Sequence, residues 1–285
     1  MKRIVALIDG SDHSRSVCDH AAWIAARTGA GVEALHVLGR RQGVKPKSDL
    51  SGNIKLGART ALLEELAAHD EAAGKLAQKK GRAILEDVHD ILAEAGVADI
   101  STRLRIGDIV EAAAEAEADA DMVLIGKRGE ASGDHAGGHL GSNFERIART
   151  LTKPILTTPT TFKPIERVLI AHDGGASSLK AVDWIARSPL FEGLWLKVLT
   201  VAEDGPESRK RVEDAQALLA AAGFAAEAEV TPGQPEPVIR DALARDGADL
   251  LVMGAYSHTR LRTLFIGSTT TEMVRACPCP VLMFR

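Results

Sequence analysis

The chain of 285 residues is long enough for two domains of ordinary size, each with its own hydrophobic core. Its 35 lysine and arginine residues and 39 aspartate and glutamate residues leave a formal net charge of −4, which excludes the basic excess typical of nucleic-acid-binding proteins. The apolar N-terminal run is too short for a signal peptide, and no apolar span reaches the roughly 18 residues of a membrane helix. The three cysteines are an odd number, which favours a reducing compartment. We therefore expect a cytoplasmic protein that contacts neither a membrane nor nucleic acid.

Short apolar strands and helical segments alternate along the first part of the chain. IVALI, at residues 4–8, predicts a strand, and the segment at 11–29 predicts a helix that ends at Gly29. A second strand is predicted at 32–38. Beyond a long helix-forming stretch, we predict a strand at 100–106, a helix at 108–118, a strand at 121–126, a helix from about Ser142 and a strand at 154–158.

The second part of the chain repeats this alternation. Predicted strands lie at 167–172, 194–201, 225–230, 249–254 and 280–284, and predicted helices at 177–187, 208–223, 236–247 and 268–276. Apolar strands that alternate with amphipathic helices favour parallel sheets covered by helices on both faces. The predicted fold class is therefore α/β.

The two parts are also similar in sequence. RIVALIDG at 3–10 is echoed by RVLIAHDG at 167–174, and LGSNFERIARTLTKPIL at 140–156 by IGSTTTEMVRACPCPVL at 266–282. The glycine of the Gly-Ser pair and the following proline are 13 positions apart in both copies. This repetition predicts two domains, 1–158 and 165–285, which we call the first and second halves, joined by the linker TPTTFKPIE at 158–166.

The first half carries an insertion. Asp9 and Gly126 are 117 positions apart, whereas Asp173 and Gly254 are 81 apart, so the first half has 36 additional residues, placed at about 41–96. Helix-forming residues dominate there, with predicted breaks at two glycines, and the segment is either a helix that covers the sheet or an arm that binds a protein partner. The apolar residues with rough helical spacing are Leu62, Leu66, Leu76, Ile84, Val88, Ile91 and Leu92, and the two glycines are Gly74 and Gly81.

Polar residues and glycines gather where the predicted strands end. In an open parallel sheet, ligands bind beyond the carboxyl ends of the strands. In the second half, Asp173 follows the first strand, and its carboxylate is suited to bind ribose hydroxyls. The Gly-Ser-Thr run at 267–269 opens the last helix, whose free backbone N–H groups are suited to bind phosphate. On these residues alone two interpretations stay open: a nucleotide site, or a turn at Gly254 with an ordinary helix N-cap at Ser268.

Other motifs give weaker signals. The chain has no Walker P-loop and no G-x-S-x-G nucleophile elbow. His135 and His139 lie among glycines, so we expect loop histidines instead of metal ligands, and we expect Cys277 and Cys279 to be small buried residues. We predict no catalytic residue and no metal site. Four cations either neutralise phosphate charge or are ordinary exposed loop residues: Lys127, Arg128, Arg260 and Arg262.

A strand that ends in Asp-Gly-Ser, followed later by a strand and the pattern G-x2-G-x9-G-[ST], resembles the universal stress protein domain. The resemblance occurs twice and covers nearly the whole chain. In the second half the pattern is Gly254-x2-Ser257-x9-Gly267-Ser268, with serine in place of the second glycine. In the first half it is Gly126-x2-Gly129, then eleven residues in place of nine, then Gly141-Ser142.

This resemblance implies a fold and a ligand. Each half would be a Rossmann-like domain with a five-stranded parallel sheet of order 3-2-1-4-5, and the two would pair through their last strands as an internal pseudo-dimer. The implied ligand is ATP or another adenine nucleotide, with Mg. The implied binding residues are, in the preferred second half, Asp173, Val201, Gly254, Ser257, Gly267, Ser268 and Thr269, and in the first half Asp9, Val37, Gly126, Gly129, Gly141 and Ser142.

Three functions are compatible with these residues. We favour a stress-response protein that binds an adenine nucleotide and acts by regulation or protection, without strong catalysis. The second is a scaffold that binds no nucleotide and recruits a protein partner through the insertion at 41–96. A homodimer is a separate possibility, not tied to the insertion. The third is a weak ATPase, although no positioned general base is evident in the sequence.

Overall fold

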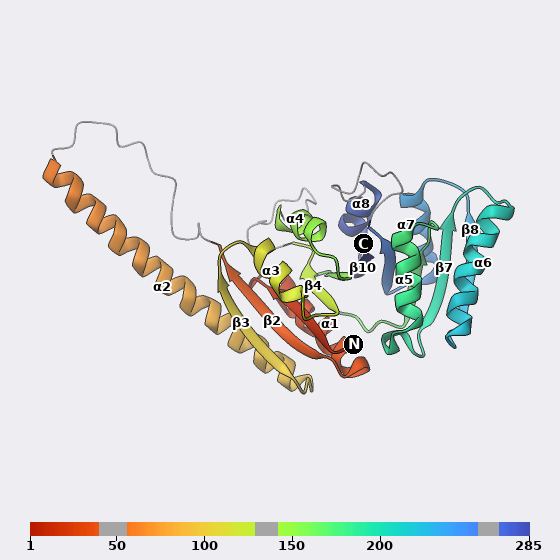
Figure 1. Cartoon of the computed structure of the whole chain (residues 1–285), viewed down its shortest axis with the longest axis horizontal. Helices are drawn as coiled ribbons and strands as arrows, with labels where there is room; N and C mark the ends of the chain where they lie inside the picture. Colours follow the sequence, from red (N-terminus) through yellow and green to blue (C-terminus); the bar gives the residue numbers. More distant parts are fainter. Residues whose placement is uncertain (40–55, 129–141, 256–267) are drawn as a thin grey trace.

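The computed structural model describes residues 1–39, 56–128, 142–255 and 268–285, and it describes only the backbone at 56–67, 142 and 268–269. Within these ranges the strands form one ten-stranded sheet with the order β3-β2-β1-β4-β5-β10-β9-β6-β7-β8 (Figure 1). The strands are β1 (Arg3–Ile8), β2 (Gly31–Leu38), β3 (Ile100–Ile106), β4 (Met122–Gly126), β5 (Ile155–Thr158), β6 (Arg167–Ala171), β7 (Trp195–Val201), β8 (Ala226–Thr231), β9 (Leu250–Gly254) and β10 (Val281–Phe284).

Both halves have the predicted strand order, and all neighbours within a half are parallel. The halves meet where β5 and β10 pair in antiparallel fashion, with Leu156 opposite Leu282 and Thr157 opposite Val281. The Thr157 hydroxyl also donates to the Val281 carbonyl at 3.2 Å. The predicted order and the pairing of the last strands are therefore confirmed, and the two predicted sheets are joined into a single one.

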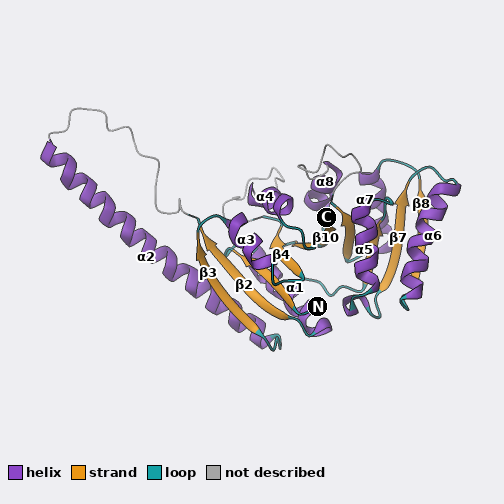
Figure 2. Ribbon diagram, viewed as in Figure 1, coloured by secondary structure: helices purple, strands orange, loops and turns teal. Residues whose placement is uncertain are grey.

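Helices cover both faces of this sheet (Figure 2). On one face α1 (His13–Thr28), α2 (Leu56–Glu94), α5 (Ala176–Ala186) and α6 (Pro206–Ala221) pack on strand residues such as Ile4 and Val168. On the other face α3 (Ile109–Glu117), α4 (Ser142–Thr150), α7 (Pro235–Asp246) and α8 (Ser268–Ala276) pack on residues such as Val5 and Leu169. Successive strand residues point to opposite faces, which explains why the apolar runs of the sequence are continuous.

The ends of the shorter helices follow from local chemistry. The Asp108 side chain accepts from the Val110 backbone N–H at 2.8 Å and so caps α3. Gly29, with φ of 69°, ends α1 as predicted. A short 3-10 turn at Pro189–Phe191 joins α5 to β7 and buries Leu190 and Phe191. None of the helices in the described part of the chain is long and apolar enough to span a bilayer.

The insertion forms α2, a helix of 39 residues, whereas its counterpart α6 has 16. From Gly81 onward α2 packs on the sheet, where Leu92 is fully buried, whereas Leu76, which precedes this part, is 68% exposed. The N-terminal part extends away from the sheet (Figure 1). At about 1.5 Å per residue the whole helix is about 58 Å long. The C-terminal part of α2 therefore covers the sheet, and its N-terminal part projects from it (Figure 1).

The predicted breaks at Gly74 and Gly81 are wrong, because α2 runs through both without interruption. At Gly81 the reason is close packing: an added Cβ would lie 2.8 Å from Leu104 Cδ1 and 3.0 Å from His36 Cδ2. Glycine here lets the helix approach β2 and β3 closely, and the packed apolar face outweighs its low helix propensity. The predicted apolar residues Leu62 and Leu66 lie outside the residues whose side chains are described.

The linker between the halves is anchored on the first half. Phe162 packs edge-on against the buried His20 of α1, with ring centroids 4.9 Å apart, and Ile165 is 2% exposed. The linker passes from the end of β5 to the start of β6, both part of the same sheet. The domain limits 1–158 and 165–285 stay predictions, because the sheet is continuous across them.

Candidate functional site

The topology brings the predicted second-half residues to one edge of the sheet. β9, β6 and β7 are neighbours, and Ala171 near the end of β6 is paired with Met253 on one side and Leu199 on the other. The carboxyl ends of these strands therefore lie side by side, with Asp173 after β6, Val201 ending β7 and Gly254 ending β9. We call this edge, together with the start of α8, the second-half site.

The first half repeats this arrangement. β4, β1 and β2 are neighbours, with Asp9 after β1, Val37 near the end of β2 and Gly126 ending β4. Val37 and Val201 are each half-buried at the same place in their halves, on the face covered by α3, α4, α7 and α8. We call this edge, with the start of α4, the first-half site.

The Asp173 carboxylate shapes the turn after β6. Its Oδ1 accepts a hydrogen bond from the Gly175 backbone N–H at 2.8 Å and another from the Ser178 hydroxyl at 2.6 Å. Gly174, which lies between Asp173 and Gly175, has φ of 78°, in the left-handed region that favours glycine. The turn is held by its own side chains, so the aspartate stands in a fixed position at the strand end.

The first half has the same turn with different residues. Asp9 Oδ1 accepts from the Ser11 backbone N–H at 3.0 Å and from the Ser14 hydroxyl at 3.3 Å, and Gly10 has φ of 80°. The serines were not among the residues predicted for either site. An Asp-x4-Ser spacing in both copies was the available signal, since it joins Asp9 to Ser14 and Asp173 to Ser178.

A side chain from the neighbouring strand supports each turn. The Thr200 hydroxyl donates to the His172 carbonyl at 2.9 Å, and the His36 Nδ1–H donates to the Ile8 carbonyl at 2.7 Å. His172 and Ile8 are equivalent residues, each just before the strand-end aspartate. A threonine in one half and a histidine in the other thus donate to equivalent backbone carbonyls. Sequence reasoning missed both donors because the residue types differ.

The glycines that end β4 and β9 are required by packing. A Cβ on Gly126 would lie 2.6 Å from His13 Cβ, and one on Gly254 would lie 3.0 Å from Ser177 Cβ and from the Ser178 backbone nitrogen. Each strand end therefore lies directly against the first turn of α1 or α5. This contact accounts for both glycines and brings the strand end and the aspartate turn together.

The start of α8 lies at the same edge. Its first turn is tied to the end of β9 by the buried Thr270, whose hydroxyl donates to the Ala255 carbonyl at 3.3 Å. The helix α4 begins at Ser142 and α8 begins at Ser268, and both starts agree with the predicted ones. The remaining predicted residues, Gly129, Gly141, Ser257 and Gly267, lie outside the described residues, as do the side chains of Ser142, Ser268 and Thr269.

Lys127 is buried, so it is not the exposed loop cation that the sequence allows. Its side chain is 8% exposed, and its Nζ donates to the carbonyls of Cys277 and Cys279 at 2.5 and 2.9 Å. It therefore holds the segment after α8, in the other half of the chain. Burial lowers the pKa of its ammonium group. Both cysteines are buried and free, as predicted. The histidines and arginines at 135, 139, 260 and 262 lie outside the described residues.

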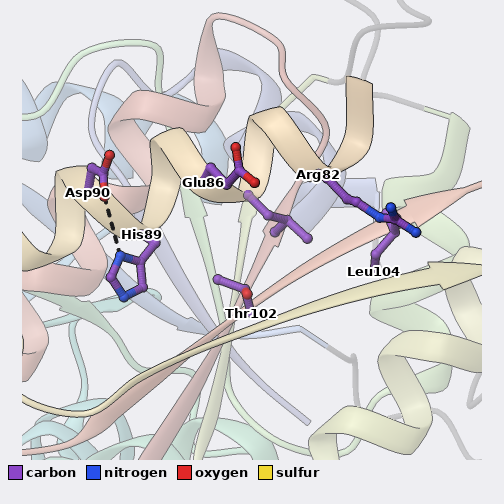
Figure 3. A pocket seen from close by; sticks show the side chains of 7 residues that line it. Arg82, Glu86, His89, Asp90, Thr102 and Leu104 are labelled. Atoms are coloured by element: carbon purple, nitrogen blue, oxygen red, sulfur yellow. Dashed lines mark hydrogen bonds and ion pairs between the residues drawn. The ribbon is translucent and has the colours of Figure 1, made fainter. Parts of the chain in front are cut away.

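A separate groove of about 610 Å³ lies between α2 and the edge strand β3 (Figure 3). Charged side chains of α2, including Arg82, Glu86 and Asp90, line one wall, and Thr102 and Leu104 of β3 line the other. Among the described residues, no group of histidine, cysteine, aspartate or glutamate is arranged to hold a metal ion, in this groove or elsewhere. The groove was not predicted and contains none of the predicted site residues.

Comparisons with known proteins bear on this arrangement. The model of the universal stress protein family matches residues 1–159 and 205–285. The universal stress protein Slr1230 of Synechocystis sp. is 36% identical over 288 residues, which cover 100% of both chains. A shorter universal stress protein of Thermus aquaticus is 29% identical over 133 residues, 41% of this chain and 97% of its own. The crystal structure of a universal stress protein from Archaeoglobus fulgidus, 18% identical, superposes with a TM-score of 0.71 over 99% of this chain and 96% of that one.

Proposed function

This chain belongs to the universal stress protein family of stress-response proteins, and from that premise we propose that its second half binds ATP or another adenine nucleotide in the cytoplasm. The protein then acts by regulation or protection, without strong catalysis. The observation that supports the proposal most is the position of α8. This helix begins beside the end of β9, at the edge where Asp173 and Val201 also lie.

The start of a helix is suited to phosphate. Its first backbone N–H groups have no partner within the helix, and the helix dipole places partial positive charge there. We propose that Gly254, Ser257, Gly267, Ser268 and Thr269 surround the phosphates. Bound Mg neutralises part of the phosphate charge.

The other end of the nucleotide then reaches the neighbouring strands. We propose that Asp173 accepts from the ribose hydroxyls and that Val201 contacts the adenine. A carboxylate whose Oδ1 is held by Gly175 and Ser178 needs little reordering on binding, so its conformational cost is small. The equivalent first-half residues form the second choice, because the loop between β4 and α4 is two residues longer there.

A scaffold role is a second candidate, favoured by the projecting part of α2. An isolated helix without tertiary packing is only marginally stable in water, and Leu76 on this part is exposed. A protein partner that packs on the projecting part would supply the missing contacts. Deletion of residues 41–80 should abolish recovery of such a partner and leave the nucleotide content intact.

Release of bound nucleotide tests the main proposal. Freshly purified protein is denatured, and the released nucleotide is identified and counted per chain. We expect about one adenine nucleotide per chain in the wild type and none in Gly267→Asp, because a carboxylate there repels phosphate. Gly141→Asp, the equivalent change in the first half, is the matched control and should keep the nucleotide. Absence of released nucleotide, together with no rise in melting temperature at millimolar ATP, would contradict the proposal.

A further inference from the structure

The helices α2 and α6 occupy equivalent places in the two halves. Ile84 lies ten residues before the end of α2 at Glu94, and Arg211 lies ten residues before the end of α6 at Ala221. Ile84 and Arg211 are therefore equivalent positions that differ in charge. The buried residues next to them keep the same spacing: Leu85 with Val212, Val88 with Ala215, and Leu92 with Leu219.

Both side chains lie over the glycine that follows the strand-end aspartate. A Cβ on Gly174 would lie 2.6 Å from both Cδ and Nε of Arg211. A Cβ on Gly10 would lie 2.7 Å from Ile84 Cδ1. The second half thus has a guanidinium group beside the Asp173 turn, where the first half has a methyl group.

Arg211 differs in its pairing from the two cations that precede it on α6. On the same helix Arg209 pairs with Asp204, and Lys210 pairs with Asp214. Arg211 is half-buried, and within the described ranges of the chain it forms no ion pair. A half-buried cation without a carboxylate partner is suited to an anionic group supplied by a ligand.

The buried histidine at the end of β6 responds to the same charge. His172 is 2% exposed, and its Nδ1 has no hydrogen-bond partner among the described residues. Burial lowers the pKa of its imidazole. Asp173 opposes this effect, and the positive charge of Arg211 adds to it. Arg211 therefore lies close enough to act electrostatically on the strand end where the ligand is proposed to bind.

We infer that Arg211 increases the preference of the second-half site for anionic ligands. The inference rests on the proposed nucleotide site. Arg211 lies beside the turn of Asp173, where the ribose is proposed to bind, and from there its positive charge attracts the phosphates of the same ligand. In the first half Ile84 covers the same turn with an apolar group, so Arg211 has no charged counterpart at that helix position. The difference is local, because the two turns are otherwise built alike.

The test compares a charged and an uncharged ligand. Nucleotide-free protein is titrated calorimetrically with ATP and with adenosine, as the wild type and as Arg211→Ile, which copies the residue of the first half. Attraction between the guanidinium and the phosphates predicts that Arg211→Ile weakens ATP binding about tenfold and leaves adenosine binding within about twofold. Arg211→Lys, which keeps the charge, should restore part of the lost ATP affinity.

Lys210→Met is the matched control, because it removes one positive charge from the position just before Arg211 on the same helix. It should change ATP affinity less than twofold. Equal losses for ATP and adenosine in Arg211→Ile, or equal losses of ATP affinity in Lys210→Met and Arg211→Ile, would overturn the inference and leave the proposed function standing. A wild type that binds neither ligand would overturn both.

Discussion

Acid should destabilise this protein through His20, a buried histidine of α1. Its side chain is fully buried, its Nδ1 lies 2.7 Å from the Ser16 carbonyl, and its Nε2 has no partner among the described residues. Protonation would place a positive charge on a ring whose second nitrogen has no acceptor there. Burial therefore lowers the pKa of this histidine from 6.5 to about 4.

The direction and size of the effect follow from these pKa values. Below about pH 6.5 the unfolded chain binds a proton at His20 that the folded chain does not, so stability falls as the pH falls. The loss stops growing only below about pH 4. Between pH 7 and pH 5 it amounts to about 2 kcal/mol, given pKa values of 6.5 in the unfolded and about 4 in the folded chain.

Urea denaturation followed by circular dichroism at pH 7, 6 and 5 measures this loss. His20→Gln keeps an amide donor for the Ser16 carbonyl and does not titrate, so its stability should depend less on pH than that of the wild type by about 2 kcal/mol over this range. His89→Gln, which changes an exposed histidine of α2, is the matched control and should behave as the wild type does. The reasoning is refuted if wild type and His20→Gln lose stability in parallel.

Three further predictions concern the stability of the fold, two through packing and one through hydrogen bonds. Gly126→Ala should lower the melting temperature more than Gly254→Ala, because the added methyl group comes within 2.6 Å of a Cβ in one case and 3.0 Å in the other; equal losses would contradict this. Leu92→Ala should cost about 2–5 kcal/mol of unfolding free energy and Leu76→Ala almost nothing; a large loss at Leu76 would show that the projecting part of α2 is packed. Lys127→Ala should cost about 1–3 kcal/mol, because two buried carbonyls lose their donor, and an unchanged urea midpoint would show that water replaces it.

Local patterns were sufficient to predict most of the fold. Apolar strand runs such as IVALI are long enough to be recognised, and their alternation with amphipathic helices favours parallel strands with helices on both faces. The repeat then located the second copy of each element. The pairing of β5 with β10 followed from the family resemblance, since neither strand's sequence identifies its partner across the halves.

The parts that failed depend on contacts distant in sequence. Gly81 looks like a helix break until Leu104 and His36 are known to lie against it. Lys127 looks like a loop cation, although its partners are carbonyls about 150 residues further along the chain. Neither contact has a local signature, because both arise only after the halves or layers pack together.

The candidate site was predictable as a set of strand ends but not as a set of contacts. Asp173 was selected from its place after an apolar strand, and the structure sets it beside β7 and β9. Arg211 could not be selected in this way, because it lies 38 positions further along, on a helix whose packing had to be known first. Only the comparison of Arg211 with Ile84 in the first half indicates its importance.

Titration of nucleotide-free protein with ATP and Mg tests the central claim most directly. We predict saturation at about one nucleotide per chain, and a melting temperature that rises with ATP concentration, because a ligand that binds only the folded state stabilises it. Gly267→Asp should remove both effects, and Gly141→Asp should keep them. A wild type that shows neither heat of binding nor a rise in melting temperature at millimolar ATP would contradict a nucleotide site in the second half.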